Sequence, residues 1–77
     1  VTSRAFYSNK LGAFLQRACQ ITGFAKALPM NTGAEAVETA LKAARKWAYK
    51  IKGVADNQAE IIVCKGNFHG RTIAIVA

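Results

Sequence analysis

The sequence predicts an α/β fold built on a strand–helix–strand unit. Two apolar runs, Phe24–Met30 and Glu60–Lys65, have the composition of strands. The second contains the unbroken run Ile61–Cys64, which is typical of a strand buried on both faces of a parallel sheet. Between the two runs, residues 34–52 carry apolar side chains at helical spacing. We therefore expect a βαβ unit of about 40 residues with a right-handed crossover.

The sequence of the central helix contains an N-terminal capping signal, an apolar face and a C-terminal stop signal. Thr32 and Glu35 have the spacing of a capping box: the Thr32 hydroxyl can accept from the Glu35 amide, and the Glu35 carboxylate can reach back to the Thr32 amide. Gly53 is a natural left-handed stop. The expected apolar stripe consists of Ala36, Val37, Ala40, Leu41, Ala44, Ala48 and Ile51.

A second amphipathic helix is expected earlier in the chain, over residues 9–22. Ser8 or Asn9 can cap its first turn, and Gly23 ends it. Gly12 lies inside it and costs about 1 kcal/mol relative to alanine, so the first turn is expected to be loose.

The start of the central helix could bind an anion. A turn between a strand and a helix leaves the amides of Gly33 and Ala34 free and pointing outward. Gly33 has no side chain, so a phosphate could approach its backbone closely. The alternative is a capped helix with no ligand, and the local sequence does not decide between the two.

The loop Gly66–Thr72 follows the second expected strand, at the end where α/β sheets bind ligands. Phe68 offers a flat face for stacking, and Arg71 offers a fork for a carboxylate or phosphate. His69 lies between them. Each side chain also has an ordinary interpretation, as a packing plug, a surface charge or a hydrogen-bonded histidine. A βαβ unit would bring this loop and Gly33 to one sheet edge, where the groups would converge.

Composition narrows the class of protein. The chain has 77 residues, is 52% hydrophobic and has a net charge of +7, so we expect one small folded unit and no disordered segment. No apolar run approaches the roughly 20 residues of a membrane span. Cys19 and Cys64 form no CxxC pair and His69 is the only histidine, so we expect reduced thiols and no metal site.

Two features leave further questions open. The chain starts on Val1 and stops in the apolar run 73–77, so we expect it to be part of a longer protein that covers its apolar surface. Five basic side chains lie in the second half of the central helix, and they form either a solvated face or a nucleic-acid-binding patch with Trp47 and Tyr49. These five are Lys42, Arg45, Lys46, Lys50 and Lys52.

The segments Asn31–Ala36 and Asn67–Thr72 together resemble the class III (subgroup II) aminotransferases, which use pyridoxal 5'-phosphate. The resemblance implies a type I pyridoxal-phosphate-dependent transferase fold, with residues 1–77 as part of the large, cofactor-binding domain. It also implies small-molecule amino-acid and 2-oxo-acid substrates, a homodimer or higher homo-oligomer, and neither nucleic acid nor membrane as a partner. The implied location is the cytoplasm, or the mitochondrial matrix if the source is eukaryotic.

Position by position, the resemblance assigns roles to four residues. Gly33 and Ala34 match the pair whose amides hold the cofactor phosphate. Phe68 matches the aromatic residue that stacks on the pyridine ring, and Arg71 matches the arginine that binds a substrate carboxylate. His69 stands where some members carry tryptophan and receives no chemical role. No lysine here matches the Schiff-base lysine and no acid matches the pyridine-pairing acid, so the chain has no assigned catalytic residue.

Three further segments, Thr2–Tyr7, Leu28–Gly33 and Ala44–Tyr49, resemble one branch of the family. Members of that branch transfer the δ-amino group of ornithine to 2-oxoglutarate and give glutamate 5-semialdehyde and glutamate. Sister branches that act on acetylornithine or 4-aminobutyrate share the two main motifs but typically carry serine before the glycine. The resemblance therefore implies ornithine as amino donor, with acetylornithine and 4-aminobutyrate as alternatives.

Overall fold

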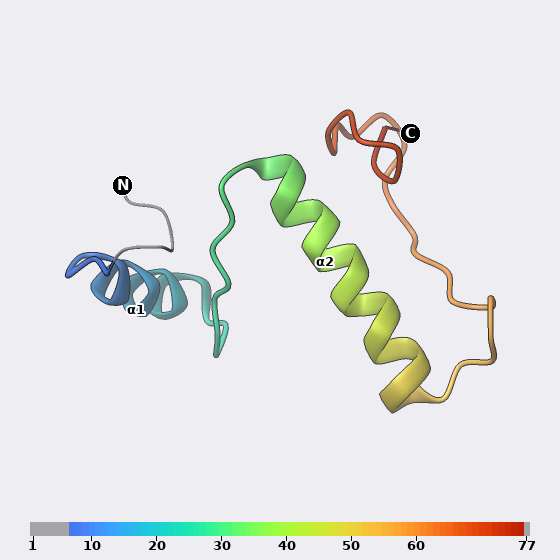
Figure 1. Cartoon of the computed structure of the whole chain (residues 1–77), viewed down its shortest axis with the longest axis horizontal. Coiled ribbons are helices and arrows are strands. Elements are labelled where there is room, and N and C mark those ends of the chain that lie inside the picture. Colours follow the sequence, from blue (N-terminus) through green and yellow to red (C-terminus); the bar gives the residue numbers. More distant parts are fainter. Residues whose placement is uncertain (1–6, 77) are drawn as a thin grey trace.

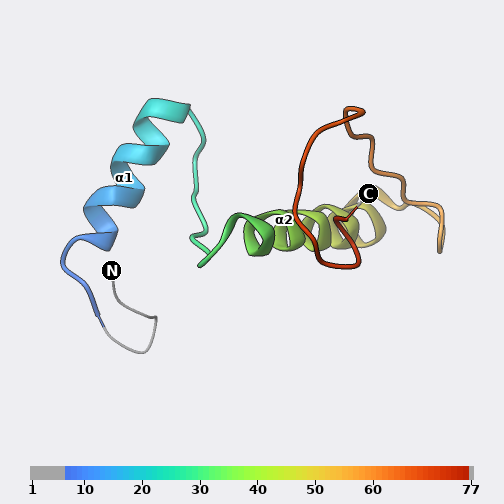
Figure 2. The same cartoon turned by 90° about the horizontal axis from the view of Figure 1, so that it is seen from above.

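The computed structural model describes residues 7–76, and helices organise that part of the chain (Figure 1). Helix α1 spans Leu11–Thr22 and helix α2 spans Gly33–Trp47, which continues into a π-helical turn, η1, at Ala48–Lys52. An extended segment joins α1 to the start of α2, and the two helices stand apart (Figures 1 and 2). The first five residues of the Thr2–Tyr7 segment lie outside the described residues.

Helix α1 starts two residues later than the sequence predicts and ends where expected. Its N-cap is Lys10, which makes no side-chain cap hydrogen bond. The expected cap by Ser8 or Asn9 is wrong, because the Ser8 hydroxyl accepts from the Lys10 amide at 3.2 Å, ahead of the first turn. At the other end Gly23 is left-handed, and its N–H donates to the Cys19 carbonyl at 2.9 Å. A glycine tolerates that conformation without strain.

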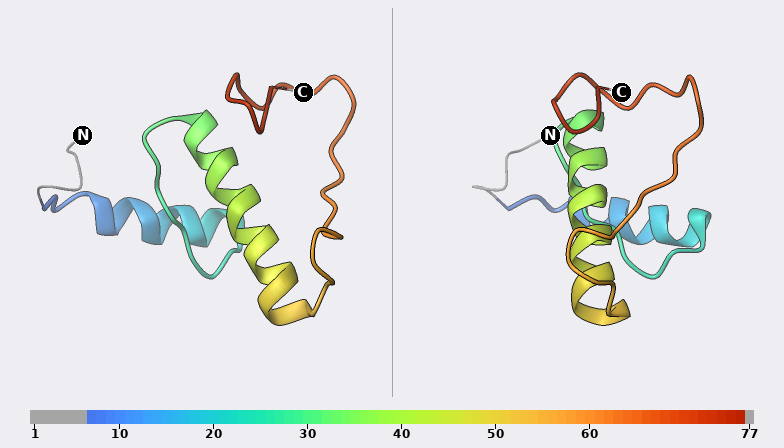
Figure 3. Two further views of the ribbon diagram at one scale, coloured as in Figure 1. Left: turned by 45° about the vertical axis from the view of Figure 1, so that its right-hand side comes forward. Right: turned by 90° about the vertical axis from the view of Figure 1, so that its right-hand side faces the viewer.

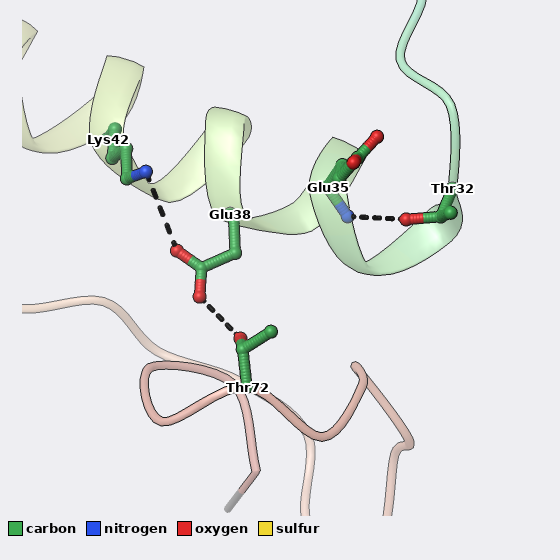
Figure 4. A network of polar contacts seen from close by, with 5 residues as sticks. All are labelled: Thr32, Glu35, Glu38, Lys42 and Thr72. Atoms are coloured by element: carbon green, nitrogen blue, oxygen red, sulfur yellow. Dashed lines mark hydrogen bonds and ion pairs between the residues drawn. The ribbon is translucent and has the colours of Figure 1, made fainter.

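The start of α2 follows the predicted capping box, with one change of partner. The Thr32 hydroxyl accepts from the Glu35 amide at 3.1 Å, as expected (Figure 4). The Glu35 carboxylate reaches one residue further back than predicted and accepts from the Asn31 amide at 2.9 Å. These two hydrogen bonds tie the residues before the helix to Glu35 in its first turn, and together they fix Gly33 as the first helical residue.

The far end of the helix widens into the π turn before Gly53 stops it. The amides of Gly53 and Val54 both donate to the Ala48 carbonyl. The Tyr49 hydroxyl accepts from the Ala59 amide at 3.3 Å and ties the following loop to this turn. The predicted helix 34–52 is therefore confirmed in extent, with its last turn wound more loosely than an α-helix.

The two predicted strands are not formed within the described residues. Phe24–Met30 and Glu60–Lys65 contain no strand there, so the expected βαβ unit is not formed within residues 7–76. A strand exists only through ladder hydrogen bonds to a neighbour. Among residues 7–76 the backbone bonds outside the helices are all local turns or caps, such as Asn67 to Cys64. Ile62 is accordingly 96% exposed, where a strand buried on both faces would cover it.

The packing centre of the described part is a fold-back of the C-terminal segment onto the first half of α2 (Figure 3). Ile75 is 3% exposed and is the buried hydrophobic side chain there. Of the predicted α2 stripe, Val37, Leu41 and Ala48 are half-buried and the rest is exposed. No helix in residues 7–76 is long and apolar enough to cross a membrane.

Candidate functional site

The candidate site lies where residues 68–75 fold back onto the start of α2. The Thr72 hydroxyl donates to the Glu38 carboxylate, joining residues 34 positions apart (Figure 4). The other oxygen of Glu38 lies 3.9 Å from the Lys42 ammonium group on the next helical turn. The loop and the helix are therefore held together by a charge-assisted hydrogen bond at this point.

Gly70 allows the loop to approach the helix backbone closely. Its φ is 137°, in the region that side chains rarely adopt, and the residue is buried. A Cβ at this position would lie 3.1 Å from the Ala34 Cβ and 3.2 Å from the Ile75 Cγ1, with the Ile75 Cδ1 closer still. A side chain at Gly70 would therefore require the Ile75 side chain and Ala34 to shift, in a backbone conformation that is strained for any residue but glycine.

An open hollow of about 640 Å³ lies between helix and loop. All four residues that the sequence nominates for cofactor and substrate, Gly33, Ala34, Phe68 and Arg71, line it. Its remaining lining is Val37, His69, Gly70 and Thr72. The convergence expected from a shared sheet edge therefore occurs, although a helix–loop contact produces it rather than a sheet.

The helix end of the hollow presents free donors. Gly33 is the first residue of α2, and within residues 7–76 no acceptor is recorded for its amide or that of Ala34. The next two amides are occupied: Glu35 donates to the Thr32 hydroxyl, and Ala36 donates to the Thr32 carbonyl at 3.0 Å. A Cβ at Gly33 would meet no atom within 4 Å. Two donors at the positive end of the helix dipole thus border open space, which suits an anion.

The loop side of the hollow carries an aromatic ring and a cation. The Phe68 side chain is 77% exposed, and the Arg71 guanidinium carbon lies 5.6 Å from its ring centroid, within cation–π range. His69 places Nδ1 3.1 Å from the Asn67 carbonyl oxygen and is half-buried. That contact occupies one of the two ring nitrogens.

Sequence reasoning missed three residues that build this site. Glu38 and Thr72 hold the loop on the helix, and Gly70 sets the closeness of the contact. Gly70 and Thr72 are the neighbours of Arg71 within the motif Asn67–Thr72. This position in the motif was the signal that could have identified them. No local pattern pairs Glu38 with a residue so far along the chain.

The fit to the family of class-III aminotransferases covers residues 1–77, and the chain belongs to this family. It is 64% identical over all 77 residues to the ornithine aminotransferase of Bacillus subtilis and 62% identical to that of Brevibacillus brevis. It is also 62% identical to ornithine aminotransferase 2 of Staphylococcus aureus. The chain spans 19% of the length of these relatives. No solved structure matches it.

Membership of this family implies a type I pyridoxal-phosphate-dependent fold for the protein to which these residues belong. The two motifs that carried the resemblance are the two segments that meet at the hollow. The alternative of a basic nucleic-acid-binding module is not favoured by these relatives.

Proposed function

We propose that the protein containing this chain is an ornithine aminotransferase. It transfers the δ-amino group of ornithine to 2-oxoglutarate and gives glutamate 5-semialdehyde and glutamate. The observation that carries the proposal is the convergence of Gly33, Ala34, Phe68 and Arg71 on one hollow, in a chain of this family. The relatives named ornithine aminotransferase support the choice of amino donor. We further propose a cytoplasmic homodimer.

The residues present fit pyridoxal 5'-phosphate. Within residues 7–76 no acceptor is recorded for the amides of Gly33 and Ala34, and both residues line the open hollow. A phosphate needs both donors and room. An exposed phenyl ring stands across the hollow, as a flat heteroaromatic ring requires. When bound, the cofactor supplies the aldehyde and the electron-withdrawing ring that carry an amino group between two substrates.

In this proposal the residues of the chain bind and orient the cofactor and the substrate. The amides of Gly33 and Ala34 offset the charge of the phosphate without a cationic side chain. Phe68 covers one face of the pyridine ring and excludes water from it. Arg71 binds a substrate carboxylate through its fork of N–H donors, and the Phe68 ring beneath restricts the directions open to that fork. The roles assigned to the lining residues are therefore binding and orientation.

The test compares three amino donors with the full-length enzyme and 2-oxoglutarate. We expect ornithine to have the highest kcat/KM, ahead of acetylornithine and 4-aminobutyrate, with glutamate formed in equal amount to the aldehyde. A higher kcat/KM for either sister substrate would overturn the choice of donor. Absence of glutamate with all three donors would overturn the transaminase assignment.

A further inference from the structure

We infer that Glu38 is a positioning residue for Arg71 and that it acts through Thr72. The inference rests on the proposed function, because it concerns how the carboxylate-binding arginine is held. Within residues 7–76 the polar partners recorded for the Glu38 side chain are Thr72, the residue that follows Arg71, and Lys42.

Two contacts hold the loop along one face of α2. Ala34 and Glu38 are four residues apart and therefore share one face of α2. Gly70 packs on Ala34, and Thr72 donates to Glu38, so the loop runs along that face with one anchor per helical turn. The Ile75 amide donates to the Thr72 carbonyl at 3.1 Å, and this turn brings the buried Ile75 side chain against Gly70.

Arg71 is the residue between the two anchors. Its backbone is held on one side by the Gly70 packing and on the other by the Thr72 hydroxyl. Its guanidinium has the Phe68 ring as neighbour, and within residues 7–76 no ion pair to a carboxylate is recorded for it. The direction of the side chain into the hollow therefore depends on the backbone anchors, and loss of the Thr72 anchor releases the arginine.

The ion pair between Glu38 and Lys42 is the matched control. Lys42 uses the second oxygen of the same carboxylate at 3.9 Å, and its side chain is 80% exposed, against 21% for Glu38. A long pair that reaches into water contributes little. Lys42→Met removes this partner of Glu38 and leaves the hydrogen bond from Thr72 in place.

The experiment uses the full-length enzyme loaded with pyridoxal phosphate and four variants: Thr72→Val, Thr72→Ser, Glu38→Leu and Lys42→Met. Thr72→Val keeps the side-chain shape without the donor, and Thr72→Ser restores the hydroxyl. Amide hydrogen exchange over residues 66–73 reports the anchor without any catalysis. We expect at least about tenfold faster exchange in Thr72→Val and Glu38→Leu, and wild-type exchange in Thr72→Ser and Lys42→Met.

The second readout separates positioning from mere structural support. In Thr72→Val and Glu38→Leu we expect KM for ornithine to rise about tenfold, while kcat changes less than twofold and the cofactor absorbance persists. Thr72→Ser and Lys42→Met should keep the wild-type KM. Unchanged exchange in Thr72→Val would show that the anchor does not exist. Faster exchange with an unchanged KM would show that the anchor is structural only, which overturns the inference.

A failure of the proposed function is distinguishable from a failure of this anchor. If the wild-type enzyme transaminates none of the three donors, the proposed function falls, and the positioning role falls with it. Hydrogen exchange in the same wild-type and variant proteins would still report whether Glu38 holds Thr72.

Discussion

Gly33→Val separates the two roles of the start of α2, as a helix terminus and as an anion site. A Cβ at Gly33 would meet no atom within 4 Å, so the branched side chain fits the described structure without a clash. We expect its methyl groups to take up part of the hollow that Gly33 and Ala34 line, where the phosphate would bind. We therefore expect a variant that folds and that binds pyridoxal phosphate poorly.

The magnitude follows from the donors. A hydrogen bond to a charged group contributes about 1.5–3 kcal/mol, so the loss of one of the two amide contacts weakens the cofactor by roughly 10- to 150-fold. Helix propensity should slightly stabilise the fold of the variant, because valine in a helix costs roughly 0.3 kcal/mol less than glycine. The free energy of unfolding of the apoenzyme should therefore change by less than about 0.5 kcal/mol.

The assay is a titration of the full-length apoenzyme with pyridoxal phosphate, followed by absorbance, together with urea unfolding of the apo form. Ala36→Val is the matched control, since it adds the same side chain to an exposed position of the same helix that does not line the hollow. The control should keep the wild-type Kd. A folded Gly33→Val enzyme with the wild-type Kd would refute the anion site and leave α2 as ordinary scaffold.

Three further substitutions test neighbouring parts of the account. Thr32→Ala removes the oxygen that accepts from the Glu35 amide and should lower the free energy of unfolding in urea by about 0.5–2 kcal/mol. Its effect on the Kd for the cofactor should be smaller than that of Gly33→Val, and an unchanged free energy of unfolding would contradict the cap. Gly70→Ala forces a side chain into φ 137° and against Ile75, and should destabilise the enzyme by roughly 1–3 kcal/mol; a neutral result would contradict the close packing. Arg71→Ala should lower kcat/KM for ornithine at least about tenfold while the cofactor absorbance persists, and an unchanged value would make Arg71 a surface charge.

Local chemistry was predictable from the sequence where the interacting groups are neighbours along the chain. Thr32 and Glu35 are three residues apart, and the Thr32 hydroxyl accepts from the Glu35 amide as the spacing indicated, whereas the Glu35 carboxylate accepts from the Asn31 amide rather than from that of Thr32. Gly23 and Gly53 ended the two helices in the left-handed conformation. The Ser8 prediction failed because several polar residues precede α1 and spacing alone does not choose among them.

The strands could not be predicted on the same basis. An apolar run such as Ile61–Cys64 describes a segment that can be buried, whereas a strand requires a partner whose identity the run does not contain. Within residues 7–76 neither predicted strand has such a partner. The helical part of the prediction was thus confirmed, and the βαβ unit is not shown by the described residues.

In the candidate site, too, local features could be predicted from the sequence and contacts between distant residues could not. Free amides at Gly33 follow from the cap, and the fork of Arg71 follows from its residue type, so both could be nominated from the sequence. The contact of Glu38 with Thr72 spans 34 positions and depends on the path of the loop, which no local rule specifies. The conformation of Gly70 likewise became evident only with Ala34 and Ile75 against it.

The most direct test of the central claim is a crystal structure of the full-length enzyme with pyridoxal phosphate. We expect phosphate oxygens within about 2.7–3.2 Å of the amide nitrogens of both Gly33 and Ala34, with the Phe68 ring stacked on the pyridine ring. A phosphate held by other residues, with these two amides bonded to water, would contradict the account.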